Sequence, residues 1–162
     1  MPLKSAILAL ATVALMPATA RAADYVIITQ DVAINAPADA AWGKIDGFCQ
    51  IGAWFKTTCV ITSGKDGEIG AMRRIADRLD ELLVARTPSS YAYSQPKSPI
   101  DYHGSAEIRP IDAGHARLIY TLVYDADALP KHEPADKAAD RDTRTKQLAF
   151  LVGAMKAAAE AN

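Results

Sequence analysis

The sequence predicts a single α+β domain, in which an antiparallel sheet of about seven strands packs against one long C-terminal helix. Most of the chain is a series of short, partly alternating segments rich in β-branched and aromatic residues, separated by turn residues, as in sheets built from hairpins. Residues 142–160 instead place apolar side chains at the 3.6-residue period of an amphipathic helix. Two short helical segments follow the first strand and precede the other strands.

Residues 1–22 have the features of a secretory signal peptide. Lys4 precedes an uninterrupted apolar run at residues 6–16, and the small residues of 18-ATARAA-23 supply a cleavage site. The alternative is a membrane anchor, but this run is too short to cross roughly 30 Å of hydrocarbon. We therefore expect secretion into a bacterial periplasm, with no stable membrane anchor after cleavage. Residues 23–162 then form one domain of ordinary size.

The charge of the mature chain excludes one class of partner. Removing residues 1–22 takes away Lys4 and Arg21 and leaves 16 basic and 19 acidic residues, a formal charge of −3. Binding to nucleic acid requires a clustered basic surface, which this composition does not provide. We expect no nucleic-acid partner, and the sequence leaves the oligomeric state open.

Both cysteines lie in the short stretch 48-FCQIGAWFKTTC-59. An exported protein meets an oxidising compartment, so a disulfide between Cys49 and Cys59 is the first interpretation. Two buried free thiols are the second. Redox or zinc chemistry is the third, but the spacing is not C-x-x-C and the three histidines are scattered singly. We expect no metal site.

The first elements are a strand at residues 24–35 and two short helices. Pro37 favours a helix start, which predicts a helix at 37–45. Gly47 ends this helix, and a second short helix is expected at 48–56. The residues of the first helix that should face the core are Ala40, Ala41 and Ile45.

Strands and turns follow from residue 57. We expect strands at 58–63, 69–76 and 79–87, with the Asp-Gly of residues 64–67 forming a tight hairpin. The composition of residues 71–86 also suits a single helix. The strand interpretation agrees better with the neighbouring hairpins.

Three further strands are expected at residues 89–95, 102–111 and 115–126, before the helix at 142–160. Alternation predicts the residues that share a face within each strand: Tyr91 and Tyr93; Tyr102, Gly104, Ala106 and Ile108; Leu118, Tyr120, Leu122 and Tyr124. The helical stripe contains Leu148, Leu151, Val152, Met155 and Ala159. The small face at Gly104 and Ala106 suits a void, and Gly153 suggests a close approach to the helix.

This order of elements, with these residues in it, resembles the START-like helix-grip superfamily, and within it the exported polyketide cyclase/dehydrase-type (SRPBCC) proteins. The resemblance covers most of the mature chain. The segments on which it rests are 31-DVAINAPADAAWGKIDGF-48, Trp54 with Cys59 after it, 70-GAMRRI-75 leading to Glu81, Tyr91-Ala-Tyr93 and Pro99-x-x-Tyr102. The sequence departs from the pattern usual in this family at Phe55-Lys56, at residues 77–80 and at residues 150–154. They fall around the expected pocket, so the resemblance does not transfer a ligand.

The resemblance implies a curved sheet gripping the long helix, with a mostly apolar cavity between them. Members bind lipids, sterols, polyketides or other hydrophobic molecules, and a minority catalyse cyclisation or dehydration. We therefore expect an exported protein that holds a small hydrophobic molecule. The alternatives are a cyclase/dehydratase-type enzyme with an acid–base pair in the cavity, and an interaction module whose cavity is filled by side chains.

The candidate ligand-binding residues are Trp54, Arg73, Glu81, Tyr91, Tyr93, Tyr102, Tyr120 and Tyr124. A tyrosine in a cavity wall offers an apolar ring and one hydroxyl, which suits a mostly apolar ligand. Trp54 and the tyrosines can equally be core residues. Arg73 and Glu81 lie on adjacent expected strands, either as a solvated surface pair or at the cavity wall. No catalytic residue can be named, because nucleophile-elbow, phosphate-loop and H-E-x-x-H motifs do not occur, and we expect no cofactor.

Overall fold

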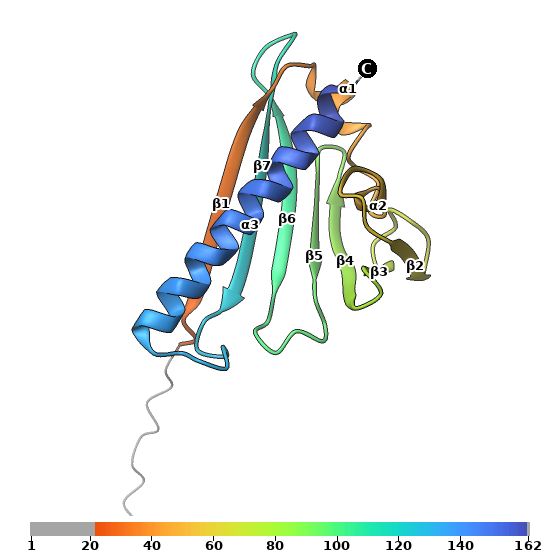
Figure 1. Cartoon of the computed structure of the whole chain (residues 1–162). Coiled ribbons are helices and arrows are strands. Elements are labelled where there is room, and N and C mark those ends of the chain that lie inside the picture. Colours follow the sequence, from red (N-terminus) through yellow and green to blue (C-terminus); the bar gives the residue numbers. More distant parts are fainter. Residues whose placement is uncertain (1–21, 162) are drawn as a thin grey trace, which may run out of the picture.

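The computed structural model describes residues 22–161 and confirms the predicted α+β helix-grip class. Seven antiparallel strands form one curved sheet in the order β1-β7-β6-β5-β4-β3-β2, and the long helix α3 crosses one face of it (Figure 1). The elements in chain order are β1 (Tyr25–Ile34), α1 (Ala38–Trp42), α2 (Ile51–Trp54), β2 (Cys59–Ser63), β3 (Met72–Ile75), β4 (Leu79–Thr87), β5 (Ser90–Ser94), β6 (His103–Pro110), β7 (Ala116–Asp125) and α3 (Pro134–Glu160). Apart from Ala22, the predicted signal peptide lies outside the described residues.

The predicted inward faces of the central strands are confirmed. Gly104, Ala106 and Ile108 of β6 lie opposite Leu122, Tyr120 and Leu118 of β7, and all six are buried. This alternation places the core between the sheet and the helices, because every second side chain points to the same face.

The two short helices are shorter than predicted. In α1, Ala41 is buried as expected and so is Ile45 just beyond it, but Ala40 is exposed, so that prediction is wrong. The helix turns Trp42 inward instead, where its ring lies 5.8 Å from the ring of Tyr91. A tryptophan buries far more apolar area than an alanine, which explains why α1 turns the face with Trp42, and not the face with Ala40, toward the core.

The strand interpretation of residues 71–86 is confirmed, and the helical alternative is wrong. Ala76 and Asp77 both have positive φ angles and turn the chain between β3 and β4. The expected tight hairpin at residues 64–67 is instead a longer connection, residues 64–71. Gly64, Gly67 and Gly70 have positive φ within it, a conformation that glycine adopts without steric cost.

Helix α3 begins at Pro134, earlier than the predicted residue 142. Proline is well placed in the first helical turn because its missing N–H has no helical partner there. The added turns are polar, so apolar periodicity could not reveal them. They carry Asp140, whose i,i+4 ion pair with Arg144 supports the helix.

Helix α3 runs diagonally across the sheet from the start of β1 toward α1 and α2 (Figure 1). Its predicted stripe is confirmed, since Leu148, Val152, Met155 and Ala159 are buried. Leu151 is only half-buried, because it lies at the edge of a cleft.

Gly153 faces solvent, so the expected close approach to the helix at this position is wrong. A Cβ atom added there meets nothing within 4 Å. Gly153→Ala is therefore expected to stabilise the protein by roughly 1 kcal/mol, since alanine loses less backbone entropy in a helix. Urea denaturation followed by circular dichroism measures this, and an unchanged or lower free energy of unfolding contradicts it.

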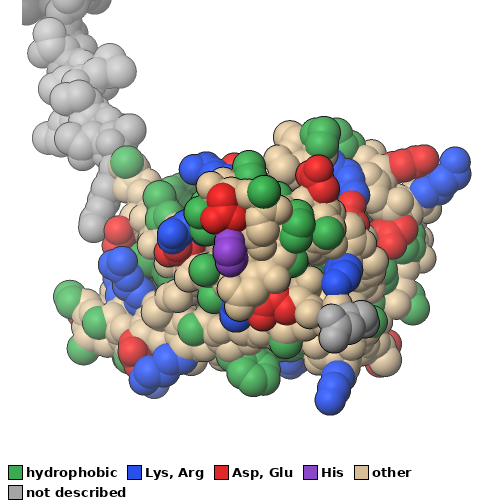
Figure 2. All heavy atoms as spheres, turned by 90° about the horizontal axis from the view of Figure 1, so that it is seen from above, with side chains coloured by type: hydrophobic (Ala, Val, Ile, Leu, Met, Phe, Trp, Pro, Cys, Tyr) green, Lys and Arg blue, Asp and Glu red, His purple; other side chains and the backbone are tan. Residues whose placement is uncertain are grey.

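Acidic and basic side chains are interspersed on the face seen in Figure 2, without a continuous basic patch. None of the helices within residues 22–161 has the length and apolarity needed to cross a membrane.

Candidate functional site

A cleft lies between α3 and the inner face of the sheet. Its inner part, which we call the tyrosine pocket, has a volume of about 330 Å³ and is lined by Phe55, Arg78, Leu79, Tyr93, Tyr102, Tyr120, Leu122, Arg144, Gln147, Leu148, Phe150 and Leu151. Next to it is the loop pocket, about 400 Å³, lined by Leu79, Gln95, Ser98, Pro99, Ile100, Tyr102, Leu129, Pro130, Arg144 and Gln147. The two pockets share four residues and therefore adjoin.

The floor of the tyrosine pocket is a pair of buried phenols. The hydroxyl groups of Tyr93 and Tyr120 are hydrogen-bonded at 2.8 Å. Tyr93 lies over Gly104, where an added Cβ would be 2.4 Å from the phenol. The ring of Tyr93 thus occupies the space that the small β6 face was expected to leave empty, and the open space lies beside it.

Burial raises the pKa of Tyr93 and of Tyr120 well above the ordinary value of a tyrosine. Burial also raises the pKa of Tyr102. A buried phenolate loses its hydration, so the neutral form is favoured. The floor therefore presents uncharged hydroxyl groups together with ring surface.

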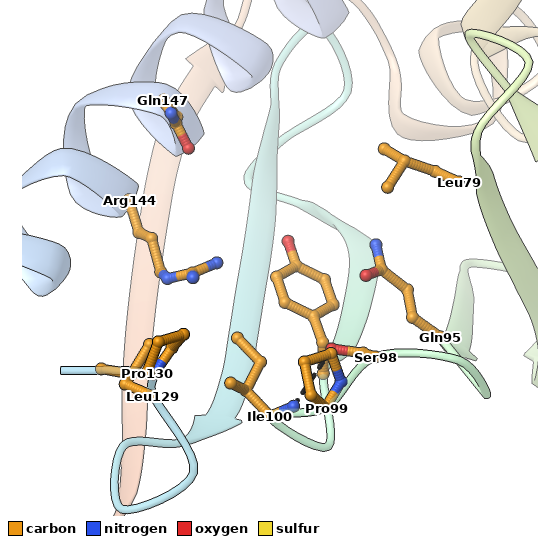
Figure 3. Close-up of a pocket in the computed structure, with 10 residues that line it drawn as sticks. Leu79, Gln95, Ser98, Pro99, Ile100, Leu129, Pro130, Arg144 and Gln147 are labelled. Carbon is orange, nitrogen blue, oxygen red and sulfur yellow. Dashed lines mark hydrogen bonds between the residues drawn. The ribbon is translucent and has the colours of Figure 1, made fainter. Parts of the chain in front are cut away.

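Arg144 of α3 is the charged group that both pockets share. Its guanidinium lies 4.6 Å from the ring centroid of Tyr124 and 6.0 Å from that of Tyr102. Its Nε donates a hydrogen bond to Asp140 at 2.7 Å. Figure 3 shows the guanidinium reaching into the loop pocket, with Gln147 on the same helix and Gln95 across the space.

Three of the predicted ligand-binding residues, Tyr93, Tyr102 and Tyr120, come together in the cleft lining. Tyr124 lies behind this lining, under Arg144. Burial and then the Asp140 carboxylate raise the pKa of Tyr124 to about 12. Tyr91 packs between Trp42 and Phe48 and is a core residue in this arrangement.

Arg73 and Glu81 face the inner side of the sheet, and their side chains are 1% and 4% exposed. The alternative of a solvated surface pair is therefore wrong. Arg73 donates from Nε and Nη2 to Glu81 Oε2 at 2.8 and 2.5 Å, and from Nη1 to the Phe48 carbonyl oxygen. Gln95 Nε2 donates to the other carboxylate oxygen at 3.0 Å.

The Arg73–Glu81 pair lies behind the cleft and does not line either pocket. The Arg73 guanidinium stacks 3.9 Å from the centroid of the Phe48 ring, and both oxygens of Glu81 have donors. Gln95, which lines the loop pocket, is the link between this pair and the cleft.

Trp54 is half-buried in α2 and does not line either pocket, and its indole N–H is buried without a hydrogen-bond partner in the described part of the chain. The next residue, Phe55, does line the tyrosine pocket. Its ring lies 5.7 Å from that of Phe150 on α3. The Phe55–Phe150 pair thus lines this part of the pocket, and a ligand contact by Trp54 stays a prediction.

The Cys49–Cys59 disulfide is present, with a Cα–Cα distance of 5.6 Å, and the interpretation of the pair as two free thiols is wrong. It joins the segment before α2 to the start of β2. Close packing continues beside it, because a Cβ on Gly52 would lie 3.2 Å from the Cys59 Cβ. Within residues 22–161 no group of three or more His, Cys, Asp or Glu side chains is placed to hold a metal ion.

Arg144 and Gln147 of α3 are lining residues that the sequence did not indicate. Phe55, Arg78 and Leu79 lie in segments predicted to surround the pocket, but they were not named as ligand-binding residues. One signal was available. Arg144 lies four residues before Leu148, on the continuation of the apolar stripe of α3. A charged residue on an otherwise buried stripe indicates either an ion pair or a pocket.

The chain belongs to the family described as polyketide cyclase / dehydrase and lipid transport, which it matches over residues 25–160. No curated protein matches the sequence.

Solved structures with the same fold include an NMR structure from Thermobifida fusca, with 20% identity, a TM-score of 0.68, and 80% of this chain and 90% of that chain covered. The Zhui aromatase/cyclase from a Streptomyces species has 19% identity, a TM-score of 0.60, and coverages of 84% and 94%. A START superfamily protein from Mycobacterium smegmatis has 14% identity, a TM-score of 0.58, and coverages of 78% and 93%. At these identities the likeness shows the fold alone.

Proposed function

We propose that this protein is an exported binding protein that holds a small, mostly apolar molecule in the cleft between α3 and the sheet. The observation that carries the proposal is the pair of adjoining pockets, about 330 and 400 Å³. Binding sites for small molecules typically have volumes of roughly 300–1,000 Å³ and apolar walls with a few polar groups. Leucine, phenylalanine and tyrosine side chains supply such walls here.

The volume argues against the interaction module with a filled cavity. That alternative requires no space larger than a few water molecules. A water molecule occupies roughly 30 Å³ in the liquid, and the tyrosine pocket alone is about 330 Å³.

Binding is also favoured over cyclisation or dehydration by an acid–base pair. Arg73 and Gln95 already donate to both oxygens of Glu81. A general base must reach the proton that it removes, and Glu81 lies behind the cleft lining. Proton transfer to Glu81 would therefore require the Arg73–Glu81 pair to open.

Export is supported by two independent features. Residues 1–22 have the pattern of a signal peptide, and the described domain contains the Cys49–Cys59 disulfide. Disulfides form and persist mainly in oxidising compartments such as the bacterial periplasm. Mass spectrometry of the mature protein tests this by locating its first residue, which we expect after residue 20 or 22.

Binding of the neutral apolar dye Nile red tests the proposed function. We expect a saturable rise in its fluorescence with the wild-type protein. Leu151→Trp should weaken binding at least about tenfold, or about 1.4 kcal/mol, because the larger ring fills the tyrosine pocket. Lys146→Trp is the matched control on the solvent side of the same helix, where the side chain is 75% exposed. Equal binding by both variants, or no saturable binding by the wild type, contradicts the proposal.

A further inference from the structure

The cleft has an uneven charge. Two arginines, Arg78 and Arg144, are among the residues that line the tyrosine pocket, and the lining of neither pocket includes an aspartate or glutamate. The other polar groups in the lining are amides and hydroxyls. A ligand that enters between α3 and the β3–β4 connection therefore meets positive charge above a neutral, apolar floor.

Arg144 is held so that part of its hydrogen-bonding capacity stays available. Only its Nε is hydrogen-bonded, to Asp140, and the two terminal nitrogens have no acceptor among the described residues. The guanidinium lies over the ring of Tyr124, at 4.6 Å, and farther from that of Tyr102, at 6.0 Å, both within cation–π range. The hydrogen bond to Asp140 and the contact with Tyr124 restrain the guanidinium, and Figure 3 shows it directed into the loop pocket.

Arg78 adds a second positive charge from the wall of the tyrosine pocket opposite α3. It is exposed and forms no ion pair in the described part of the chain. The negative charge of Asp140 balances the positive charge of Arg144, because its carboxylate accepts the hydrogen bond from Arg144 Nε. One uncompensated positive charge thus remains across the two walls of the tyrosine pocket.

We propose that the ligand is an amphipathic acid, whose carboxylate binds Arg144 and whose apolar body lies in the tyrosine pocket. This inference rests on the proposed function and specifies its ligand class. A planar guanidinium pairs with a carboxylate through charge-assisted hydrogen bonds. The pair forms beside aromatic rings, where the Arg144 side chain is only 22% exposed, and such bonds are stronger there than at a fully open surface.

Three probes with the same alkyl chain test the head group: decanoate, decanol and decylamine. Isothermal titration calorimetry at neutral pH should give the order decanoate, then decanol, then decylamine, with decanoate at least about tenfold tighter than decanol. The preference should fall as salt is added, since part of it is electrostatic. These measurements use the wild-type protein and do not depend on a variant folding.

The variant Arg144→Gln tests whether Arg144 is the residue that binds the carboxylate. It should reduce the preference for decanoate over decanol to about twofold or less. Arg141→Gln is the matched control, because it removes the same charge from an exposed position on the same helix. Circular dichroism confirms that each variant is folded.

The outcomes separate the two proposals. Equal binding of decanoate and decanol by the wild type overturns the acid ligand and leaves the binding function standing. A preference that survives in Arg144→Gln, or falls equally in Arg141→Gln, overturns the role of Arg144. No binding of any of the three probes, together with no binding of Nile red, counts against both proposals.

Discussion

Arg73→Met is expected to lower the free energy of unfolding by about 3–5 kcal/mol, the usual cost of leaving one partner of a buried ion pair without the other. The reason is the burial of Glu81, which is 3% exposed. Without Arg73, its carboxylate keeps only the hydrogen bond from Gln95. The loss also removes the stacking on Phe48.

The matched control is Arg74→Met, on the same strand but on the outer face of the sheet. Arg74 is 41% exposed and pairs with Asp80, which keeps a second partner in Lys97. Its loss should cost about 1 kcal/mol or less. Equal losses in the two variants, measured by urea denaturation, contradict the prediction.

A double variant separates the charge from the packing. Arg73→Met with Glu81→Leu replaces both ions by apolar side chains, so no charge stays buried without a partner. We expect it to recover most of the stability lost in Arg73→Met, because a buried ion pair is often no more stabilising than a well-packed apolar pair. A double variant as unstable as the single one contradicts this explanation.

Replacing both Cys49 and Cys59 with alanine should cost about 2.5–3 kcal/mol. The two residues are separated by 10 positions, and closing a loop of that size in the unfolded chain removes this much conformational freedom in the chain-entropy model. Alanine removes the bond without adding a hydroxyl group at a half-buried position.

Reductant provides the control for the disulfide. Denaturation of the wild type in the presence of dithiothreitol should show a loss similar to that of the double alanine variant, which itself should not respond to dithiothreitol. A double variant within about 1 kcal/mol of the wild type would show that the loop is already restricted in the unfolded chain.

The strands could be predicted because their evidence is local. In β7, Leu118, Tyr120, Leu122 and Tyr124 alternate with exposed or half-buried residues, and one face of that pattern had to be buried. The Cys49–Cys59 pair could be predicted for a similar reason, since two cysteines after a predicted export signal leave few alternatives. The first turns of α3 could not, because their ion pairs leave no apolar period.

The burial of Arg73 and Glu81 could not be predicted from their types, because such pairs usually lie on the surface. It depends on Phe48, which comes from a distant segment and covers the guanidinium. The place of Arg144 in the cleft depends likewise on Tyr102 and Tyr124, which are far from it in sequence. These contacts exist only once the helix crosses the sheet.

The amino-acid sequence by itself determined the fold class, the inward faces of the strands, the disulfide and the helix that grips the sheet. These follow from hydrophobic periodicity and from local chemistry, which act over a few residues. Only the tertiary structure decided that Arg144 and Gln147 line the cleft while Tyr91 and Glu81 lie behind it. The physical reason is that a pocket is the space left by packing, and its lining depends on the angle and depth at which α3 settles on the sheet.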